Sequence, residues 1–204
     1  MRTLAALSLC TLACCAASAS GNTVTFASDP FAGSTALTTP GRQVASNNEL
    51  FLPSFNIALD QFVVDNTFFN VGSIVYFGND FASNLPVGGL NVIVLRDTDN
   101  DANPATAFNA GSAANLIAAR VTTPGAGLFI YWNSSLNVNR LVYSTNLDDN
   151  TADLSVLARI TSPTGQDAIA ELPRFTAGNF AIIPAPSAAA LLGLAGIAAA
   201  RRRR

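Results

Sequence analysis

An acidic loop near the middle of the chain holds the residues best suited to bind a metal ion. Asp97, Asp99 and Asp101 alternate along a polar stretch that follows a short apolar run. Carboxylates at this spacing can wrap around Ca²⁺, which prefers hard oxygen ligands. The loop differs from an EF-hand, because Ala102 replaces the required glycine and Phe108 replaces the bidentate glutamate. Two interpretations stay open: a calcium site, or a solvated turn in which Asp and Asn favour loop geometry.

The residue types available restrict the enzymatic chemistry of the chain. It contains no His and no Lys, and its three cysteines lie at positions 10, 14 and 15. A serine nucleophile therefore lacks a His or Lys base, and a zinc site lacks its usual ligands. Two carboxylates alone can hydrolyse a glycosidic bond, but acids scattered over turns are not a specific signal. We expect no enzymatic activity and no cofactor other than calcium.

Two weaker candidates lie later in the chain. Asp148 and Asp149 form a second acidic turn, which is a metal site only if it folds beside the first. Trp132 with Tyr131 could form a platform for stacking sugars, but adjacent strand positions point to opposite faces of a sheet. Packing of the single Trp in the core is the favoured interpretation.

The body of the chain is acidic once its two ends are set aside. All thirteen carboxylates lie between residues 20 and 183, together with only six of the eleven arginines, which leaves a net charge of −7. A surface of this charge is unsuited to nucleic acid, so we expect no nucleic-acid partner.

We predict an all-β body, a β-sandwich of the jelly-roll or immunoglobulin-like type. Short β-branched or aromatic runs bounded by Gly, Asn, Pro or Asp are typical of strands, and several at loose spacing fit two packed sheets. The Ala-rich segment 112–120 fits either a short helix or another strand, and 28–53 is expected to be coil or edge structure. The runs cover residues 23–26, 57–64, 73–77, 90–95, 128–132, 140–144, 154–160 and 180–183.

The first nineteen residues are typical of a secretory signal peptide. Arg2 supplies a positive start, residues 4–17 form an uncharged apolar stretch, and Ala17 and Ala19 flank Ser18 as a small-residue cleavage site. A buried N-terminal helix and a lipoprotein signal are the disfavoured alternatives. We therefore assign residues 1–19 to a signal peptide.

A second apolar segment, residues 188–200, precedes four arginines: Arg201, Arg202, Arg203 and Arg204. As a single helix it would be about 20 Å long, against about 30 Å for a bilayer core, so its flanks must help it to span. The arginines would hold this end on the cytoplasmic side and leave the body outside. A buried helix with a basic cap is disfavoured, because the run has no polar face.

Pro184, Ala185 and Pro186 stand just before that apolar segment. The order of proline signature, short apolar helix and arginine cluster resembles the PEP-CTERM sorting domain, here as a Pro-Ala-Pro variant covering residues 182–204. The resemblance implies recognition at Pro184 to Pro186 and cleavage by an exosortase, a membrane-embedded enzyme. It also implies a Gram-negative-type bacterial envelope, in association with exopolysaccharide and biofilm.

These features predict how the protein is exported, processed and located. It is expected to be secreted across the inner membrane, transiently membrane-anchored, and released or attached at the cell surface or in the extracellular matrix. Residues 20–181 would form the secreted domain, a non-enzymatic structural or adhesive element. The alternative is a lectin-like module that binds exopolysaccharide. The expected partners are an exosortase-type enzyme, the membrane before processing, and exopolysaccharide.

Overall fold

A computed structural model describes residues 21–185, which form two β-sheets and three short α-helices in a mixed α/β arrangement. The smaller sheet has three parallel strands in the order β1-β4-β10. Its central strand is the most buried, with three consecutive buried residues from Phe62 to Val64. These strands are β1 (Thr23–Phe26), β4 (Gln61–Asp65) and β10 (Phe180–Ile183).

The larger sheet has seven strands in the order β2-β9-β8-β7-β6-β5, with β3 also pairing with β9. The β5-β6-β7 part is parallel, whereas β7, β8 and β9 form an antiparallel meander. The short strands β2 and β3 run parallel to β9. These strands are β2 (Val44–Ala45), β3 (Leu50–Leu52), β5 (Phe77–Asp80), β6 (Val92–Leu95), β7 (Gly127–Asn133), β8 (Val138–Ser144) and β9 (Leu154–Ile160).

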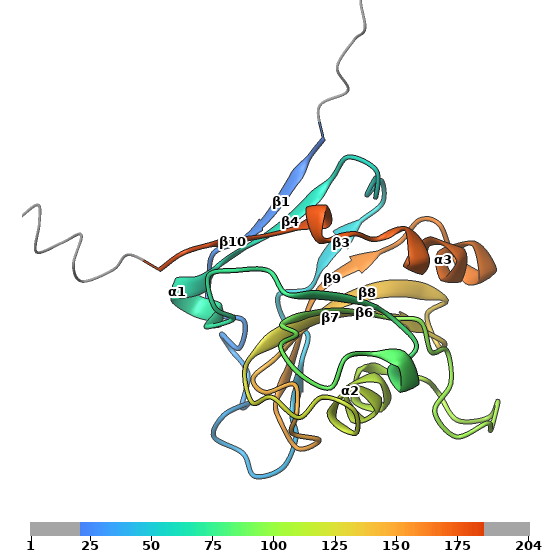
Figure 1. The fold of residues 1–204 in the computed structure, drawn as a ribbon, viewed down its shortest axis with the longest axis horizontal. Helices are drawn as coiled ribbons and strands as arrows, with labels where there is room; N and C mark the ends of the chain where they lie inside the picture. The colour runs from blue at the N-terminus through green and yellow to red at the C-terminus, as the bar shows by residue number, and fades with distance from the viewer. Residues whose placement is uncertain (1–20, 186–204) are drawn as a thin grey trace, which may run out of the picture.

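Both faces of the larger sheet are covered, as Figure 1 shows. Successive residues of a strand point to opposite faces, so β6 contributes to two cores. Val92 and Val94 pack in the core shared with the smaller sheet, whereas Ile93 and Leu95 pack in the core against α2 (Ala110–Ala118). The molecule therefore has three layers: the small sheet, the large sheet and a helix.

The predicted all-β sandwich is wrong, because the sheets are largely parallel and helices are interspersed between the strands. The physical reason lies in the strands of the larger sheet. All four residues of β6 are buried, as expected for a strand covered on both faces, and not for a sandwich strand with one solvated face. The unbroken apolar run of residues 92–95 carried this signal.

The ambiguous segment 112–120 lies largely in helix α2. Asn109 caps this helix, because its side-chain oxygen accepts a hydrogen bond from the Ser112 backbone N–H at 3.1 Å. Small residues allow close packing on the sheet, and Ala113 is fully buried there. The other helical elements are α1 (Asn66–Phe69), α3 (Gly165–Glu171), and the 3₁₀ turns η1 (Ala82–Asn84), η2 (Leu172–Arg174) and η3 (Ala177–Asn179).

Several strand predictions are confirmed, with β1, β9 and β10 matching the predicted runs residue for residue. The stretch 28–53 contains only the short edge strands β2 and β3 and irregular structure, as expected. The predicted strand 73–77 is wrong except at Phe77, where β5 begins. The preceding residues form a loop instead, and this loop becomes one wall of a surface groove.

Candidate functional site

A surface groove lies where three parallel strands begin. Its volume is about 390 Å³, and it is open to solvent. Parallel strands present their amino ends at one edge of a sheet, so the segments that lead into β5, β6 and β7 meet there. These segments are residues 70–76, 89–91 and 123–126.

Asn91 organises one wall of the groove from a largely buried position. Its side-chain oxygen accepts a hydrogen bond from the Tyr76 N–H at 2.8 Å. Its amide group donates to the Val71 carbonyl at 2.7 Å and to the Ile74 carbonyl at 2.8 Å. A single side chain thus binds three backbone groups of the loop and holds the loop against the sheet.

Tight turns shape the rim of the groove. Asn70 ends α1 in the left-handed region, with φ of 50°, and Gly72 follows with φ of 87°. A Cβ atom at Gly72 would make only an ordinary contact, 3.7 Å from the Asn91 amide nitrogen, so it is the positive φ that favours glycine at this position. On the opposite rim, Gly89 has φ of 78°, and its N–H donates to the Thr123 hydroxyl at 3.3 Å.

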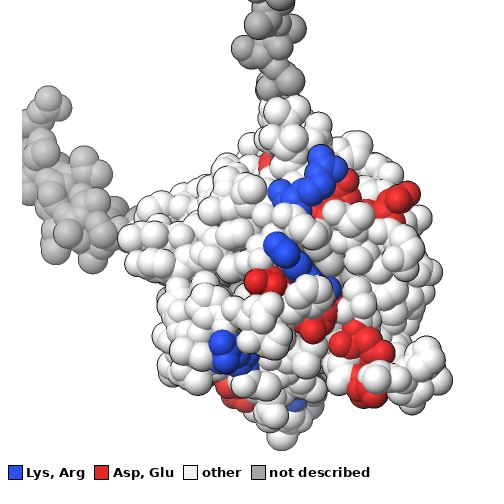
Figure 2. Space-filling model, turned by 45° about the vertical axis from the view of Figure 1, so that its right-hand side comes forward, with Lys and Arg blue, Asp and Glu red and all other residues white. Residues whose placement is uncertain are grey.

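The side chains along the groove are apolar or neutral. Tyr76 and Ile74 are 53% and 57% exposed, large fractions for such side chains. Asn70, Ser73 and Thr123 add amide and hydroxyl groups, and within residues 21–185 no charged side chain lines this groove. Figure 2 shows that charged side chains on the face it presents form small mixed groups among wide uncharged areas. The groove therefore suits an uncharged ligand.

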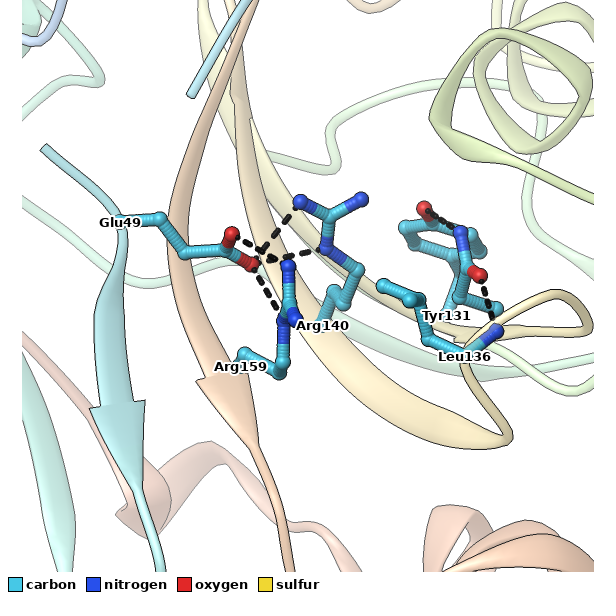
Figure 3. Close-up of polar contacts among 6 residues, drawn as sticks. Glu49, Tyr131, Leu136, Arg140 and Arg159 are labelled. Atoms are coloured by element: carbon cyan, nitrogen blue, oxygen red, sulfur yellow. Dashed lines mark hydrogen bonds and ion pairs between the residues drawn. The ribbon is translucent and has the colours of Figure 1, made fainter. Parts of the chain in front are cut away.

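A second polar cluster lies where β8 and β9 pair, beside the segment that leads into β3 (Figure 3). Glu49 precedes β3 and reaches two arginines that face each other on β8 and β9. Arg140 places Nε and Nη2 each 2.9 Å from Glu49 Oε1. Arg159 donates from Nη2 to Oε2 at 2.9 Å and from Nε to Oε1 at 3.2 Å.

This cluster holds the segment around β3 against the large sheet. The side chains of Glu49, Arg140 and Arg159 are only 5%, 12% and 24% exposed, so the charges are largely removed from water. The Arg159 guanidinium also lies over the exposed Phe51 ring, 4.8 Å from its centre. Both carboxylate oxygens of Glu49 are occupied by the arginines, and the cluster therefore anchors the segment around β3 to β8 and β9.

The acidic loop does not bring its three carboxylates together. Asp97 accepts a hydrogen bond from the Ala82 N–H at 2.7 Å, which ties the loop to η1. Asp99 accepts from the Asp101 N–H at 3.1 Å, and Asp101 accepts from the Asn103 N–H at 3.0 Å. These side chains cap successive turns of their own backbone, as the solvated-turn interpretation describes. Hydrogen bonds to the loop backbone lower the pKa of Asp99.

No group of three metal-ligating His, Cys, Asp or Glu side chains forms anywhere in residues 21–185. In the second acidic turn, Asp149 accepts hydrogen bonds from the N–H and the hydroxyl of Thr151, both at 2.7 Å, which lower its pKa. Neither acidic turn thus presents a preformed set of metal ligands.

Tyr131 and Trp132 point to opposite faces of the large sheet. Tyr131 is fully buried in the core beneath α2, where burial raises the pKa of its phenol and its hydroxyl accepts from Asn133 at 2.9 Å. Trp132 is half-buried against the core between the sheets. The favoured interpretation, core packing of this Trp, is borne out only in part, because Trp132 packs against the core without being fully buried.

The sorting signature lies at the boundary of the described residues. Pro184 and Ala185 directly follow β10 and are exposed, whereas Pro186, the apolar segment 188–200 and Arg201 to Arg204 lie outside the described residues, as do Ala17 and Ala19. Between residues 21 and 185, the structure contains no helix with the length and apolar character needed to cross a membrane.

Comparisons of the chain with protein-family models, with curated proteins and with solved structures give no match.

Sequence reasoning missed both the groove and the Glu49 cluster. Tyr76 belongs to an apolar run that is typical of a buried strand, and its exposure depends on Asn91, fifteen residues later in the chain. Glu49 is one of only two glutamates in the body, which was the available signal for a special role. Its partners lie 91 and 110 residues away, beyond the reach of local patterns.

Proposed function

We propose that this protein is a secreted, non-enzymatic structural or adhesive element of a bacterial cell surface or extracellular matrix, sorted by an exosortase-type enzyme. One observation carries the proposal: Pro184, Ala185 and Pro186, the apolar segment 188–200 and four arginines follow one another in that order. Each feature alone is common, but together they match the layout of a removable membrane tether.

The position of the signature relative to the body supports this proposal. Strand β10 pairs with β4 up to Ile183, and Phe180 is buried among the aromatic rings of the core. Pro184 lacks a backbone N–H and cannot extend the strand as a donor. The chain therefore leaves the fold at Ile183, and Pro184 and Ala185 are exposed beyond it. Cleavage after this point would remove no residue of the described core.

The chemistry of the body supports a non-enzymatic role. Among the residues that line the groove at the start of β5, β6 and β7, Tyr76 is the one with a titratable side chain. A general acid–base mechanism needs groups with pKa values near the working pH, and the chain has no His to supply one. Binding to a partner or a scaffolding role, by contrast, requires a complementary surface but no acid–base group.

The test follows the full chain in a bacterium that has an exosortase-type enzyme. The variant with Pro184→Ala and Pro186→Ala removes both prolines of the signature. Wild-type protein should lose its C-terminal segment and reach the cell surface, whereas the variant should retain the segment and stay in the inner membrane. Intact mass and cell fractionation measure the two outcomes.

Pro173→Ala provides the matched control, because Pro173 is also exposed but lies in η2, outside the signature. This control should be processed like the wild type. A double variant that is cut and exported as efficiently as the wild type would contradict the proposal. Equal processing in a strain without the exosortase-type enzyme would also contradict it.

A further inference from the structure

The groove at the start of β5, β6 and β7 has an exposed surface that the fold itself does not use. The side chain of Asn91 makes its hydrogen bonds to the backbone of the 71–76 loop, which forms one wall of the groove. The Tyr76 ring and the Ile74 side chain are exposed to solvent. Exposed apolar groups beside a preformed hollow are typical of a ligand site. The residues that line the groove and the position of the groove in the sheet indicate which class of ligand it can bind.

Charge excludes several classes of ligand. The lining residues carry no Arg or Lys to pair with phosphate or carboxylate, and no Asp or Glu to pair with a cation. An anionic ligand would lose part of its hydration without gaining a charged partner, which is costly. A ligand that fits this groove is therefore neutral.

Position in the sheet disfavours a peptide as the neutral ligand. Extended peptides bind most readily by adding a strand along a free sheet edge. The groove instead lies across strand ends: the Tyr76 carbonyl already accepts hydrogen bonds from the backbone of Asn91 and Val92, and the Asn91 carbonyl accepts one from Leu128. The inner strand β6 is paired on both sides, with β5 and with β7. Strand β5 ends the sheet, but the groove does not run along it, because none of the β5 residues lines the groove.

We propose that the groove binds a neutral saccharide, with a sugar ring stacked on Tyr76. A sugar ring has an apolar face of C–H groups and a rim of hydroxyls. Tyr76 and Ile74 supply exposed apolar surface for the face, and an aromatic ring with a polar tip is suited to such an amphipathic partner. Asn70, Ser73 and Thr123 supply amide and hydroxyl groups for the rim.

The walls of the groove are set before the ligand arrives. Asn91 fixes the loop that carries Tyr76, and left-handed backbone at Asn70, Gly72 and Gly89 shapes the rim. A preformed site loses less conformational entropy on binding. Because the groove is open, a saccharide can enter as an internal unit of a longer chain as well as a free sugar. The inference goes beyond sorting, and either can fail without the other.

The test uses the isotope-labelled full chain in a sugar-free detergent. The probes are neutral tetrasaccharides of glucose, galactose or mannose, and an oligogalacturonate serves as the anionic counterpart. At least one neutral tetrasaccharide should produce saturable shifts in the amide signals of Gly72, Gly89 and Gly125, whereas the oligogalacturonate should not. Tyr76→Ala should weaken the binding about tenfold, the loss expected when a stacked aromatic ring is removed.

Two further variants make the result specific. Tyr76→Phe keeps the ring and should bind within about threefold of the wild type. Phe81→Ala is the matched control, because Phe81 is similarly exposed, at 48%, but lies beyond the other end of β5. Thermal melting verifies that each variant is folded. The proposal is overturned if no neutral probe shifts these glycines, if only the anionic probe does, or if Tyr76→Ala binds as tightly as Phe81→Ala.

Discussion

The Glu49 cluster and the Tyr76 groove are built in the same way but differ in what they leave exposed. In both, one largely buried polar side chain holds a loop against the large sheet: the Glu49 carboxylate through two arginines, and the Asn91 amide through three backbone groups. In the cluster, the interacting groups satisfy one another and are mostly buried. In the groove, Asn91 is satisfied, but the Tyr76 ring that it positions is left exposed. The difference separates a site that stabilises the fold from a site that is available to a ligand.

The largest effect should come from breaking the Glu49 cluster. Glu49→Gln removes the only negative charge between two partly buried arginines, so unfolding free energy should fall by about 3 kcal/mol. Denaturant-induced unfolding measures this loss. Glu171→Gln is the matched control, because its partner Arg174 is exposed, and it should cost less than about 1 kcal/mol. Equal small losses in the two variants would show that the cluster is not an anchor.

Removing the Asn91 side chain should have the second-largest effect. Asn91→Ala leaves three backbone groups of the 71–76 loop without their partner, so we expect a loss of about 2 kcal/mol in unfolding free energy. Asn48→Ala removes a single exposed hydrogen bond of 3.4 Å and should change stability by less than about 0.5 kcal/mol. Faster amide hydrogen exchange confined to the groove loop in Asn91→Ala would locate the effect. Unchanged exchange there would contradict the role assigned to Asn91.

Tyr143 connects α1, which leads into the groove, to the large sheet. Its hydroxyl donates to the Phe69 carbonyl at 2.7 Å, and burial, together with the charge of Asp29, raises its pKa from 10.0 to about 12. Because the folded state favours the neutral phenol, this contribution to stability is complete below pH 10 and is lost as the pH rises towards 12.

Tyr143→Phe should therefore cost about 1 kcal/mol at neutral pH, the value of one buried hydrogen bond. It should also flatten the fall in melting temperature above pH 10. Melting curves across this range, with tyrosinate absorbance recorded in parallel, measure both effects. An identical alkaline fall in the wild type and in the variant would show that this phenol does not link α1 to the sheet.

The smallest effect on stability should come from Tyr76, and this sharpens the comparison. Tyr76→Ala truncates an exposed side chain, so unfolding free energy should change by less than about 0.5 kcal/mol. Denaturant unfolding beside Glu49→Gln provides the direct contrast. A loss of several kcal/mol would make Tyr76 a structural residue and remove the distinction between the two sites.

Local patterns predicted much of the secondary structure but not the way in which the strands pair. Residues 154–160 form a strand because β-branched and aliphatic residues favour one, and β9 is there as expected. Parallel pairing depends on distant partners, such as β4 with β10, which no local pattern specifies. The four consecutive apolar residues of β6 were the available clue to a sheet covered on both faces.

The groove was harder to predict than the fold. The run 73–77 has the composition of a strand, and only the distant Asn91 explains why most of it forms a loop. The acidic loop stood out by composition, yet its carboxylates hydrogen-bond to nearby backbone N–H groups and do not gather around a common centre. Composition identified polar loops, whereas their use depends on contacts between distant segments. The sorting signature differs from these sites, because it is defined by the order of residues along the chain and needs no contact between distant segments.

The intact mass of the protein recovered from the bacterial surface tests the central claim most directly. The account predicts a mass that lacks the signal peptide, residues 1–19, and every residue after the Pro184 to Pro186 signature, with or without an added group at the new C-terminus. A surface form whose mass still includes Arg201 to Arg204 would contradict it.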